Sequence, residues 1–500
     1  MATATQPIPA ILDLEKAIDE FRKTVEPLLD PTQEENWDGS KLKAKEWAIL
    51  QAGLQLVGQC IAILIYRLVV TESVKLAANL RAQGTAGLNY VNQAFKEVTI
   101  TLIGGVQVRV PTLYKLSRHR QTGRGRRRKR GKRGKSQGQG FYPVLVLLGI
   151  SEGVSPLLRC LVTQAATQAV SFEQARPWVA WLGLNFSTRR IRRISEAFCR
   201  VGLQIRAQRM ARLAAGDLLP GDALRGKRVV VSVDGGRINI REPKTRGRKR
   251  KSGRRGYDTN WREPKLLTIY VLDEEGRKVV STDVPLVQDG TLLGLEEFLA
   301  LLRSYLQELG IAQAEAVILI GDGAPWIWEN IPSLLQELGC RPEQITQILD
   351  YYHASEHLHL LAEALFGKTS QAQGWARKWS RRLKRGWARS LLAEVSRYLS
   401  EKGCKDMKET QKQHDYFQRH QEHRRLDYAR FKAHRLPIGS GVVESLIRQV
   451  VNLRLKSSGK FWLLETAEAF LHARCQWAAH LWSSFCDAVL TFGLAPLPAI

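Results

Sequence analysis

Two aspartates each follow a short apolar run and are flanked by glycine. Asp234 ends the run Val229–Asp234 and precedes two glycines, and Asp322 lies between two glycines after the run Ala316–Ile320. Short apolar runs rich in β-branched residues predict buried strands. If these strands are neighbours in one sheet, their carboxylates meet at one edge and repel each other unless a hard cation lies between them. The pattern therefore indicates a Mg²⁺ (or Mn²⁺) site suited to phosphoryl transfer.

Further polar residues with catalytic potential come later in the chain. Asp350 follows a further predicted strand, Ile345–Leu349, and precedes His353 by three residues. Glu444 falls in the first turn of a predicted helix after a glycine-rich segment, and Arg448 shares its helix face at the i+4 position. A glutamate in this setting is by itself usually an ordinary surface residue.

The overall charge points to a polyanionic partner. The chain of 500 residues has a formal net charge of +28, and 44% of its residues are hydrophobic, which is enough for several cores. Nucleic acid fits this charge better than a membrane surface, because no lipidation motif or amphipathic anchor accompanies it. The alternative is a well-solvated basic protein without such a partner.

The remaining bulk features fit a soluble cytoplasmic protein. Seven scattered cysteines form no CxxC pair, which favours reduced thiols over disulfides or a zinc site. The N-terminus lacks the basic-then-apolar layout of a signal peptide. The run Ala48–Val70 is apolar, but Gln51, Gln55 and Gln59 form a polar ridge, so a long and mostly buried soluble helix is expected rather than a membrane span.

Two basic runs are expected to contact phosphates without regard to sequence. The runs Arg118–Lys135 and Lys244–Arg255 hold eleven and eight Lys or Arg residues. Their charge, and the glycines and lack of apolar residues in the first, predict flexible arms, for which the alternative is a solvated loop. The candidate DNA contacts in these arms are Arg126, Arg127, Arg128, Lys129, Arg130, Arg248, Lys249, Arg250 and Lys251.

A helix-turn-helix pattern precedes the first aspartate. Ser171–Leu182 and Thr188–Cys199 have helical periodicity, and Ser187 is a plausible N-cap of the second helix. In such motifs the second helix reads the major groove near its N-terminus, although any basic helical hairpin has a similar pattern. The candidate DNA contacts there are Arg189, Arg190, Arg192 and Arg193.

Residues 355–435 are predicted to be helical throughout. Trp375, Trp379 and Trp387 lie among basic residues, a pattern that suits stacking on exposed bases and makes Trp375 and Trp379 candidate DNA contacts. The alternative, which we favour for at least two of the three, is that these tryptophans form the core of a helical insertion.

The predicted elements around the acids have a definite order. Strands at Val229–Val233, Leu266–Leu272 and Lys278–Pro285 are followed by a helix at Leu292–Leu309. After this helix come the strand that ends before Asp322, a helix near residue 335, and the strand that ends before Asp350. This is the order of a ribonuclease H-like α/β fold, in which a third acid comes from a later helix.

The expected domains follow from these patterns. Residues 1–95 form a helical region, 96–141 a β-hairpin around Gly104-Gly105 with the first basic arm, and 142–205 a helix-turn-helix-like DNA-binding domain. Residues 227–360 form the first part of the catalytic core, 361–436 an all-α insertion, and 437–500 the last part of the core with C-terminal helices.

Five ordered blocks resemble a known family. They are VSVDGGR (231–237), IGDGAPWIW (320–328), DYYHASEHL (350–358), IGSGVVES (438–445) and NLRLKSSGKFW (452–462). The set resembles insertion-sequence transposases of the Mutator-like DDE group, in particular ISKra-type and ISLre-type elements. The resemblance covers about residues 227–480 and is weaker before them.

The resemblance implies roles for individual residues. Asp234, Asp322 and Glu444 match the catalytic and metal-binding acids, and two Mg²⁺ (or Mn²⁺) ions are implied. Asp350 and His353 match an accessory block in which the histidine positions a phosphate or, as we prefer, hydrogen-bonds the aspartate. The last block holds the candidate DNA contacts Arg454 and Lys456. Relatives often carry paired cysteines after the hairpin, where this chain has its first basic arm, so no zinc is expected.

The implied activity is DNA transposition. The enzyme would bind the terminal inverted repeats of its element and its target as double-stranded DNA, and would act as a homodimer or higher oligomer on DNA. One alternative is a nuclease or resolvase on the same fold, which cuts without joining strands. The other is a non-catalytic basic nucleic-acid-binding protein, whose signature would be the loss of an acid.

Overall fold

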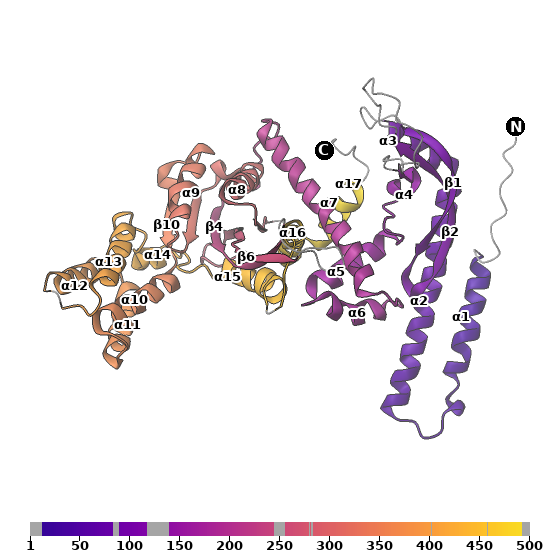
Figure 1. The fold of residues 1–500 in the computed structure, drawn as a ribbon, viewed down its shortest axis with the longest axis horizontal. Coiled ribbons are helices and arrows are strands. Elements are labelled where there is room, and N and C mark those ends of the chain that lie inside the picture. The colour runs from indigo at the N-terminus through magenta and orange to yellow at the C-terminus, as the bar shows by residue number, and fades with distance from the viewer. Residues whose placement is uncertain are drawn as a thin grey trace. The chain divides into compact units, whose positions relative to one another are not determined.

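The chain folds into two compact units. A computed structural model describes residues 13–83, 90–117, 140–244, 256–279, 281, 284–401, 403–457 and 459–492 (Figure 1). The first unit comprises residues 1–205 and 483–500, and the second comprises residues 206–482. The division between the two units falls after residue 205. Within the segment 437–500, which was expected to hold the last part of the core and C-terminal helices, residues up to 482 belong to the second unit and the described residues 483–492 belong to the first.

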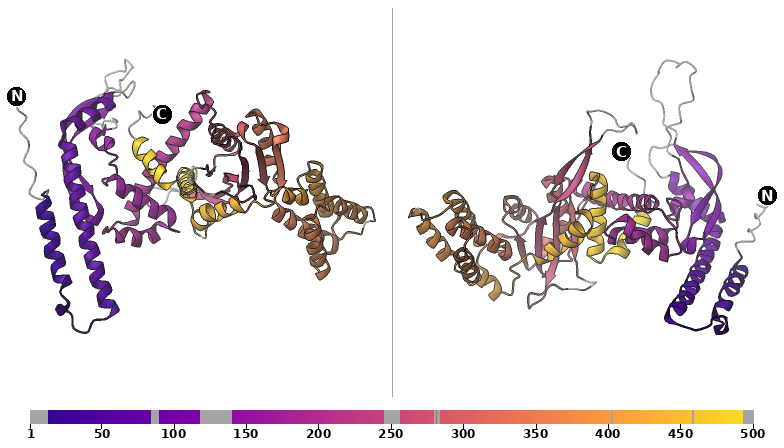
Figure 2. Two further views of the ribbon diagram at one scale, coloured as in Figure 1. Left: turned by 180° about the vertical axis from the view of Figure 1, so that it is seen from behind. Right: turned by 60° about the horizontal axis from the view of Figure 1, so that its bottom comes forward.

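The first unit begins with helices and a β-hairpin. Helices α1 and α2 lie antiparallel (Figures 1 and 2), and Val98 of β1 pairs with Val110 of β2, as the predicted hairpin requires. At the hairpin tip Gly104 has a φ of 70°, and a Cβ there would lie 2.4 Å from the carbonyl oxygen of Leu54, so glycine lets the tip touch α2. The elements are α1 (Leu14–Leu29), α2 (Gly39–Val70), α3 (Glu72–Gln83), β1 (Tyr90–Thr101), β2 (Gln107–Ser117) and β3 (Gly140–Phe141).

Helix α2 is exposed along one face. It is long and apolar enough to cross a membrane by length and composition, and 28% of its most apolar window is buried. The expectation that it is mostly buried is therefore wrong. A single helix of this kind is weak evidence for a membrane span.

Three helices of the first unit share one core. The buried side chains of Leu158, Val179, Phe186, Ile191 and Ile194 belong to a single apolar cluster. The predicted helix pair is confirmed, because Ser171 caps the first helix and the Ser187 hydroxyl accepts a hydrogen bond from the backbone N–H of Arg190 at 3.3 Å. The elements are α4 (Pro143–Leu147), α5 (Pro156–Gln168), α6 (Phe172–Trp181), α7 (Thr188–Ala214), which runs into the second unit, and α17 (Trp482–Phe492).

The second unit is built on a five-stranded mixed sheet of order β10-β9-β4-β7-β8. Strand β4 runs antiparallel to β7, and β7 runs antiparallel to β8. On its other side β4 runs parallel to β9, and β9 runs parallel to β10. The strands are β4 (Arg228–Gly235), β7 (Lys265–Leu272), β8 (Val287–Thr291), β9 (Ala316–Gly321) and β10 (Ile345–Leu349).

Side chains of alternate strand residues point to opposite faces of this sheet. Val229, Val231 and Val233 of β4 pack in one core with α8 (Leu295–Leu309) and α9 (Pro325–Glu337). Val230 of β4 and Ile318 of β9 pack in a second core, which includes α10 (Tyr351–Phe366) and residues of the helical insertion. The two cores explain why these strands are apolar at nearly every position.

The third sheet strand differs from the prediction. It is β8 (Val287–Thr291), whereas the expected strand at Lys278–Pro285 contributes only a bridge between Lys278 and Leu272 among its described residues. A separate hairpin of β5 (Ile238–Pro243) and β6 (Tyr257–Arg262) leads into and out of the second basic run.

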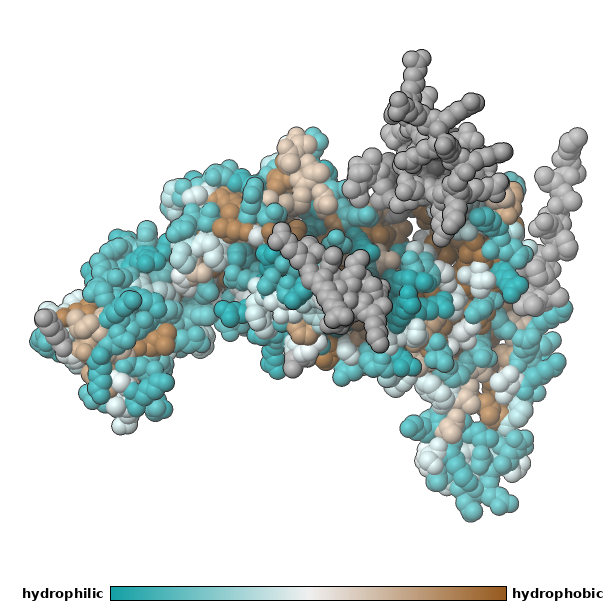
Figure 3. Space-filling view, in the orientation of Figure 1, coloured by the Kyte–Doolittle hydropathy of each residue, from teal (hydrophilic) through white to brown (hydrophobic). Residues whose placement is uncertain are grey.

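Helices make up the rest of the second unit. The insertion is helical, as predicted, and its surface on the face shown in Figure 3 is mostly hydrophilic. The elements are α11 (Ser370–Leu383), α12 (Ala388–Ser400), α13 (Met407–Glu422), α14 (Tyr428–Ala433), α15 (Gly441–Ile447), the π-helical segment η6 (Arg448–Leu455) and α16 (Leu464–Ala478).

Candidate active site and basic surfaces

The sheet register brings Asp234 and Asp322 together. Strand β4 pairs in parallel with β9 so that Ser232 lies opposite Ile320. Continuing this register by two residues sets Asp234 opposite Asp322, at the carboxyl ends of strands that are about 4.8 Å apart. Asp234 lies two residues beyond Ser232, and Asp322 lies two residues beyond Ile320. Because side chains alternate between the two faces, both aspartates belong to the same face of the sheet. The convergence expected from the sequence follows directly from this pairing.

Helix α15 brings Glu444 to the same region. The helix packs against β4 and β7. Ser440 is its N-cap residue, and the Ser440 hydroxyl donates a hydrogen bond of 2.8 Å to Oε1 of Glu444. The charge of Glu444 acts on Asp234 strongly enough to raise its pKa. The third predicted acid is thus an electrostatic neighbour of the first.

Asp350 is fully buried and organises the backbone beneath the acids. Its Oδ1 accepts hydrogen bonds from the backbone N–H groups of Tyr352 at 2.6 Å and His353 at 2.9 Å, which caps α10. Its Oδ2 accepts a hydrogen bond from the backbone N–H of Ser440. One carboxylate therefore ties the start of α10 to the start of α15, and so holds the residue that orients Glu444. These contacts make Asp350 a positioning residue.

The ionisation of Asp234 reflects its surroundings. Burial raises its pKa, and the negative charges of Asp322 and Glu444 raise it further. The backbone N–H of Gly235, which donates to Oδ1 at 2.6 Å, and the nearby His353 act in the opposite direction. The net result is a pKa of about 7. A carboxyl group in this state is stabilised as an anion by any cation that enters the cluster.

The two basic accessory residues play smaller parts than expected. The His353 ring does not hydrogen-bond Asp350, which receives the backbone N–H of His353 instead. Its Nδ1 lies 3.6 Å from Oε2 of Glu356, and its charge lowers the pKa of Asp234. Arg448 is exposed, and no ion pair joins it to Glu444 within the described parts of the chain.

The acids suit Mg²⁺ by their chemistry. In the part of the chain that the structure describes, no three His, Cys, Asp or Glu side chains are close enough to hold one ion. Mg²⁺ usually keeps several waters and is bound by one or two carboxylates together with substrate phosphates, so it does not need such a cage. The all-oxygen donor set and the raised pKa of Asp234 fit a cation between Asp234 and Asp322.

The insertion contributes a tyrosine that the sequence analysis missed. Tyr416 of α13 lies so close to Gly323 that a Cβ there would be 2.5 Å from the Tyr416 hydroxyl oxygen. That hydroxyl is buried and has no hydrogen-bond partner among the described atoms. Burial and the charges of Asp322 and Asp350 raise its pKa, so it stays protonated and can donate. No sequence signal could have linked a helix of the insertion to the sheet edge.

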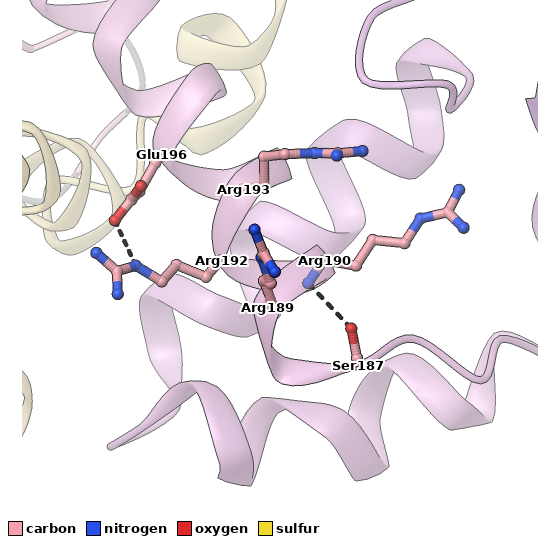
Figure 4. Close-up of a pocket in the computed structure, with 6 residues that line it drawn as sticks. All are labelled: Ser187, Arg189, Arg190, Arg192, Arg193 and Glu196. Atoms are coloured by element: carbon pink, nitrogen blue, oxygen red, sulfur yellow. Dashed lines mark hydrogen bonds and ion pairs between the residues drawn. The ribbon is translucent and has the colours of Figure 1, made fainter. Parts of the chain in front are cut away.

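The arginines of α7 line a cavity of about 480 Å³ (Figure 4). Arg192 pairs with Glu196 at 2.7 Å, and Arg193 pairs with Glu152 at 2.6 Å. Arg190 donates to the Thr101 hydroxyl at 3.0 Å. The guanidinium groups of these residues and of Arg189 point in different directions in Figure 4 and do not converge on one point.

Burial contradicts three of the predicted DNA contacts. Trp375 and Trp379 are 8% and 1% exposed, and their indole N–H groups both donate to Oε1 of Glu394, so they cannot stack on bases. Core packing is thus the correct interpretation for these two, whereas Trp387 is 49% exposed. Arg454 is 2% exposed and packs against aromatic rings.

Lys456 is exposed and stays a candidate. The two groups of arm residues, 126–130 and 248–251, lie outside the described residues. No protein-family model matches the chain, and no curated protein matches it.

Proposed function

We propose that the protein is a DDE transposase with a ribonuclease H-like catalytic core, which binds the ends of a DNA element and cleaves and transfers strands. The observation that carries this proposal is the register of two adjacent parallel strands, which sets Asp234 opposite Asp322. Glu444 belongs to α15, which packs against β4, and its negative charge acts on Asp234. The order of three antiparallel strands followed by two strands parallel to the first supports the fold assignment.

Each residue of the site has a distinct task. A bound Mg²⁺ (or Mn²⁺) pair would supply the charge that activates an attacking oxygen and stabilises the leaving 3′ oxygen of a phosphodiester. Asp234, Asp322 and Glu444 would hold the ions. Ser440 orients Glu444 through its hydroxyl. The Tyr416 hydroxyl beside Gly323 offers a donor to a phosphate oxygen or a water.

The basic surfaces support DNA as the substrate. The α7 arginines and the two basic arms contribute to the net charge of the chain, which is +28. Charge of this kind supplies affinity for phosphates at any sequence, whereas α6 and α7 offer the geometry for reading an element end. We place the protein in the bacterial cytoplasm, in association with the nucleoid, because its substrate is there.

A paired cleavage and binding assay tests the proposal. Asp234→Asn, Asp322→Asn and Glu444→Gln should each reduce Mg²⁺-dependent DNA cleavage by at least about 100-fold and leave DNA binding within about twofold. The matched control is Glu343→Gln, an exposed carboxylate beside the opposite end of β10, which should keep full cleavage. Full cleavage by the Glu444→Gln variant would overturn the assignment of the third acid.

The same assay separates the rival activities. A nuclease or resolvase would cut the DNA but would not join the freed 3′ end to a second duplex. A non-catalytic binding protein would shift the DNA in a gel and leave it intact with either metal ion. Joined products that depend on all three acids would support a transposase.

A further inference from the structure

One face of α2 carries an apolar stripe that no described residue of its own unit covers. Leu50, Val57 and Leu64 are 50%, 47% and 56% exposed, and they recur every seven residues. They alternate with four other residues at intervals of three and four, which is the spacing of a coiled-coil seam. We call this set the α2 seam: Glu46, Leu50, Gly53, Val57, Cys60, Leu64 and Arg67.

Two glycines of α2 differ in their surroundings, and the one on the seam leaves room for a second helix. A glycine inside a helix costs about 1 kcal/mol relative to alanine. Gly58, on the buried face, has a reason to be glycine, because a Cβ there would lie 2.2 Å from the carbonyl oxygen of Ile103. Gly53, on the seam, has nothing within 4 Å of a Cβ position. Its small size is explained if a second helix packs closely against the seam.

The charges at the two ends of the seam select the partner and its direction. Glu46 and Arg67 are both exposed, and neither forms an ion pair in the described chain. They are 21 residues apart and so about 32 Å apart along the helix, too far to pair within one chain. A second α2 running antiparallel and centred near Val57 brings Glu46 of each copy within about one turn of Arg67 of the other. A parallel arrangement would place like charges together.

We propose that the α2 seam binds the α2 seam of a second copy of this chain in antiparallel orientation. In this register Leu50 of one helix lies near Leu64 of the other, the two Val57 residues lie near each other, and Gly53 lies near Cys60, where the small side chains let the two backbones come close. A lipid surface fits less well, because the stripe is narrow and charged at both ends. The proposal does not rest on transposase activity, although it would supply the two copies that joining two DNA ends requires.

The first test removes the apolar seam without disturbing the fold. Leu50→Gln, Val57→Gln and Leu64→Gln are combined in one variant of the full chain, whose folding is checked by circular dichroism. Light scattering at micromolar concentrations, without DNA or metal, should show dimers for the wild type and monomers for the variant. The matched control combines Leu76→Gln and Leu80→Gln, which replace leucines of α3 that are 62% and 59% exposed, and should stay dimeric.

The second test uses the charges. Glu46→Arg alone and Arg67→Glu alone should each weaken dimerisation by up to about tenfold, and the double variant should restore it. Because the two residues cannot pair within one chain, rescue shows that Glu46 of one copy faces Arg67 of the other. Double variants that stay as weak as the single variants would overturn the antiparallel arrangement.

Two further results would overturn the proposal itself. One is a wild-type chain that stays monomeric at all concentrations. This includes a monomeric wild type that floats with vesicles of acidic phospholipid while the seam variant does not, which would mean that the seam binds lipid. The other is a seam variant that remains dimeric. Neither result bears on cleavage by Asp234, Asp322 and Glu444, which is measured separately.

Discussion

The surroundings of the Asp234 carboxyl group raise its pKa. Its pKa of about 7 lies above that of an unfolded chain, because the group is buried and faces Asp322 and Glu444. The protonated form therefore stabilises the metal-free fold at low pH, and this contribution is lost as the pH rises through about 7. A bound cation instead favours the ionised form of the Asp234 carboxyl group.

We predict that Mg²⁺ stabilises the protein more at pH 8 than at pH 6. At pH 6 most Asp234 is protonated and binds the ion poorly, whereas at pH 8 the carboxylate is free to bind. Thermal unfolding with and without millimolar Mg²⁺ measures the effect, which should reach several degrees at pH 8. In the Asp234→Asn variant the shift should be small at both pH values. An equal shift in the variant would contradict the assignment of this residue as a ligand.

Ser440 should act through Glu444. The Ser440→Ala variant loses the hydroxyl that donates to Oε1 of Glu444, so it should need about tenfold more Mg²⁺ for half-maximal cleavage. Ser440→Thr keeps a hydroxyl and should restore the wild-type requirement. Metal titrations of the cleavage rate compare the three proteins. If Ser440→Ala kept the wild-type metal requirement, the hydrogen bond would have no part in holding Glu444.

At the scale of elements, α13 and α9 enclose a buried histidine. His420 is 1% exposed, and its ring lies 5.7 Å from that of Trp328. Burial, together with the positive charges of Arg425 and Arg419, lowers its pKa to about 3. The neutral ring thus contributes stability that is present above the unfolded pKa of about 6.5 and is lost as the pH falls toward 3.

We predict that His420→Gln reduces the acid sensitivity of the protein. Between pH 7.5 and 5.5 the wild type should lose about 1 kcal/mol of unfolding free energy through this residue. The reason is that His420 becomes protonated in the unfolded chain but stays neutral in the folded chain. Urea denaturation of both proteins at the two pH values measures the difference. An identical loss in the variant would show that other groups account for the acid sensitivity.

The strands that the sequence located correctly are rich in apolar residues. Strands β4, β7, β9 and β10 lie between two cores, so burial on both faces marks them in the sequence. Their acids could be predicted because they end such runs. The hydrogen bonds of Asp350 to α10 and α15 depend on a chain segment 90 residues away and left no local pattern.

Strand β8 was missed because its buried residues are polar. Asp289 is fully buried, and its carboxylate bonds His472 at 3.0 Å, Tyr305 at 2.8 Å and Arg206. Burial acts to raise the pKa of Asp289, but His472 and Arg206 outweigh it and hold the pKa at about 2. A strand whose partners are charged residues of distant helices has no apolar periodicity to detect.

At the scale of the whole molecule, the basic arms should set affinity without sequence choice. Replacing the five residues Arg126–Arg130 with glutamine should weaken binding to all DNA about equally. It should also make the logarithm of affinity less dependent on the logarithm of salt concentration, by up to about 0.9 for each phosphate that the arm no longer neutralises. Titrations of cognate and unrelated duplexes at several salt concentrations measure both quantities. A weakening confined to the element end would mean that the arm reads bases.

In the proposed mechanism Asp234, Asp322 and Glu444 would hold two metal ions. Anomalous diffraction from crystals of the protein grown with a DNA end and Mn²⁺ tests it most directly. We predict two peaks about 3.5–4 Å apart at the carboxyl ends of β4 and β9, each within bonding distance of at least one of these carboxylates. Peaks elsewhere in the molecule, or the absence of peaks at this sheet edge in an otherwise ordered complex, would contradict the account.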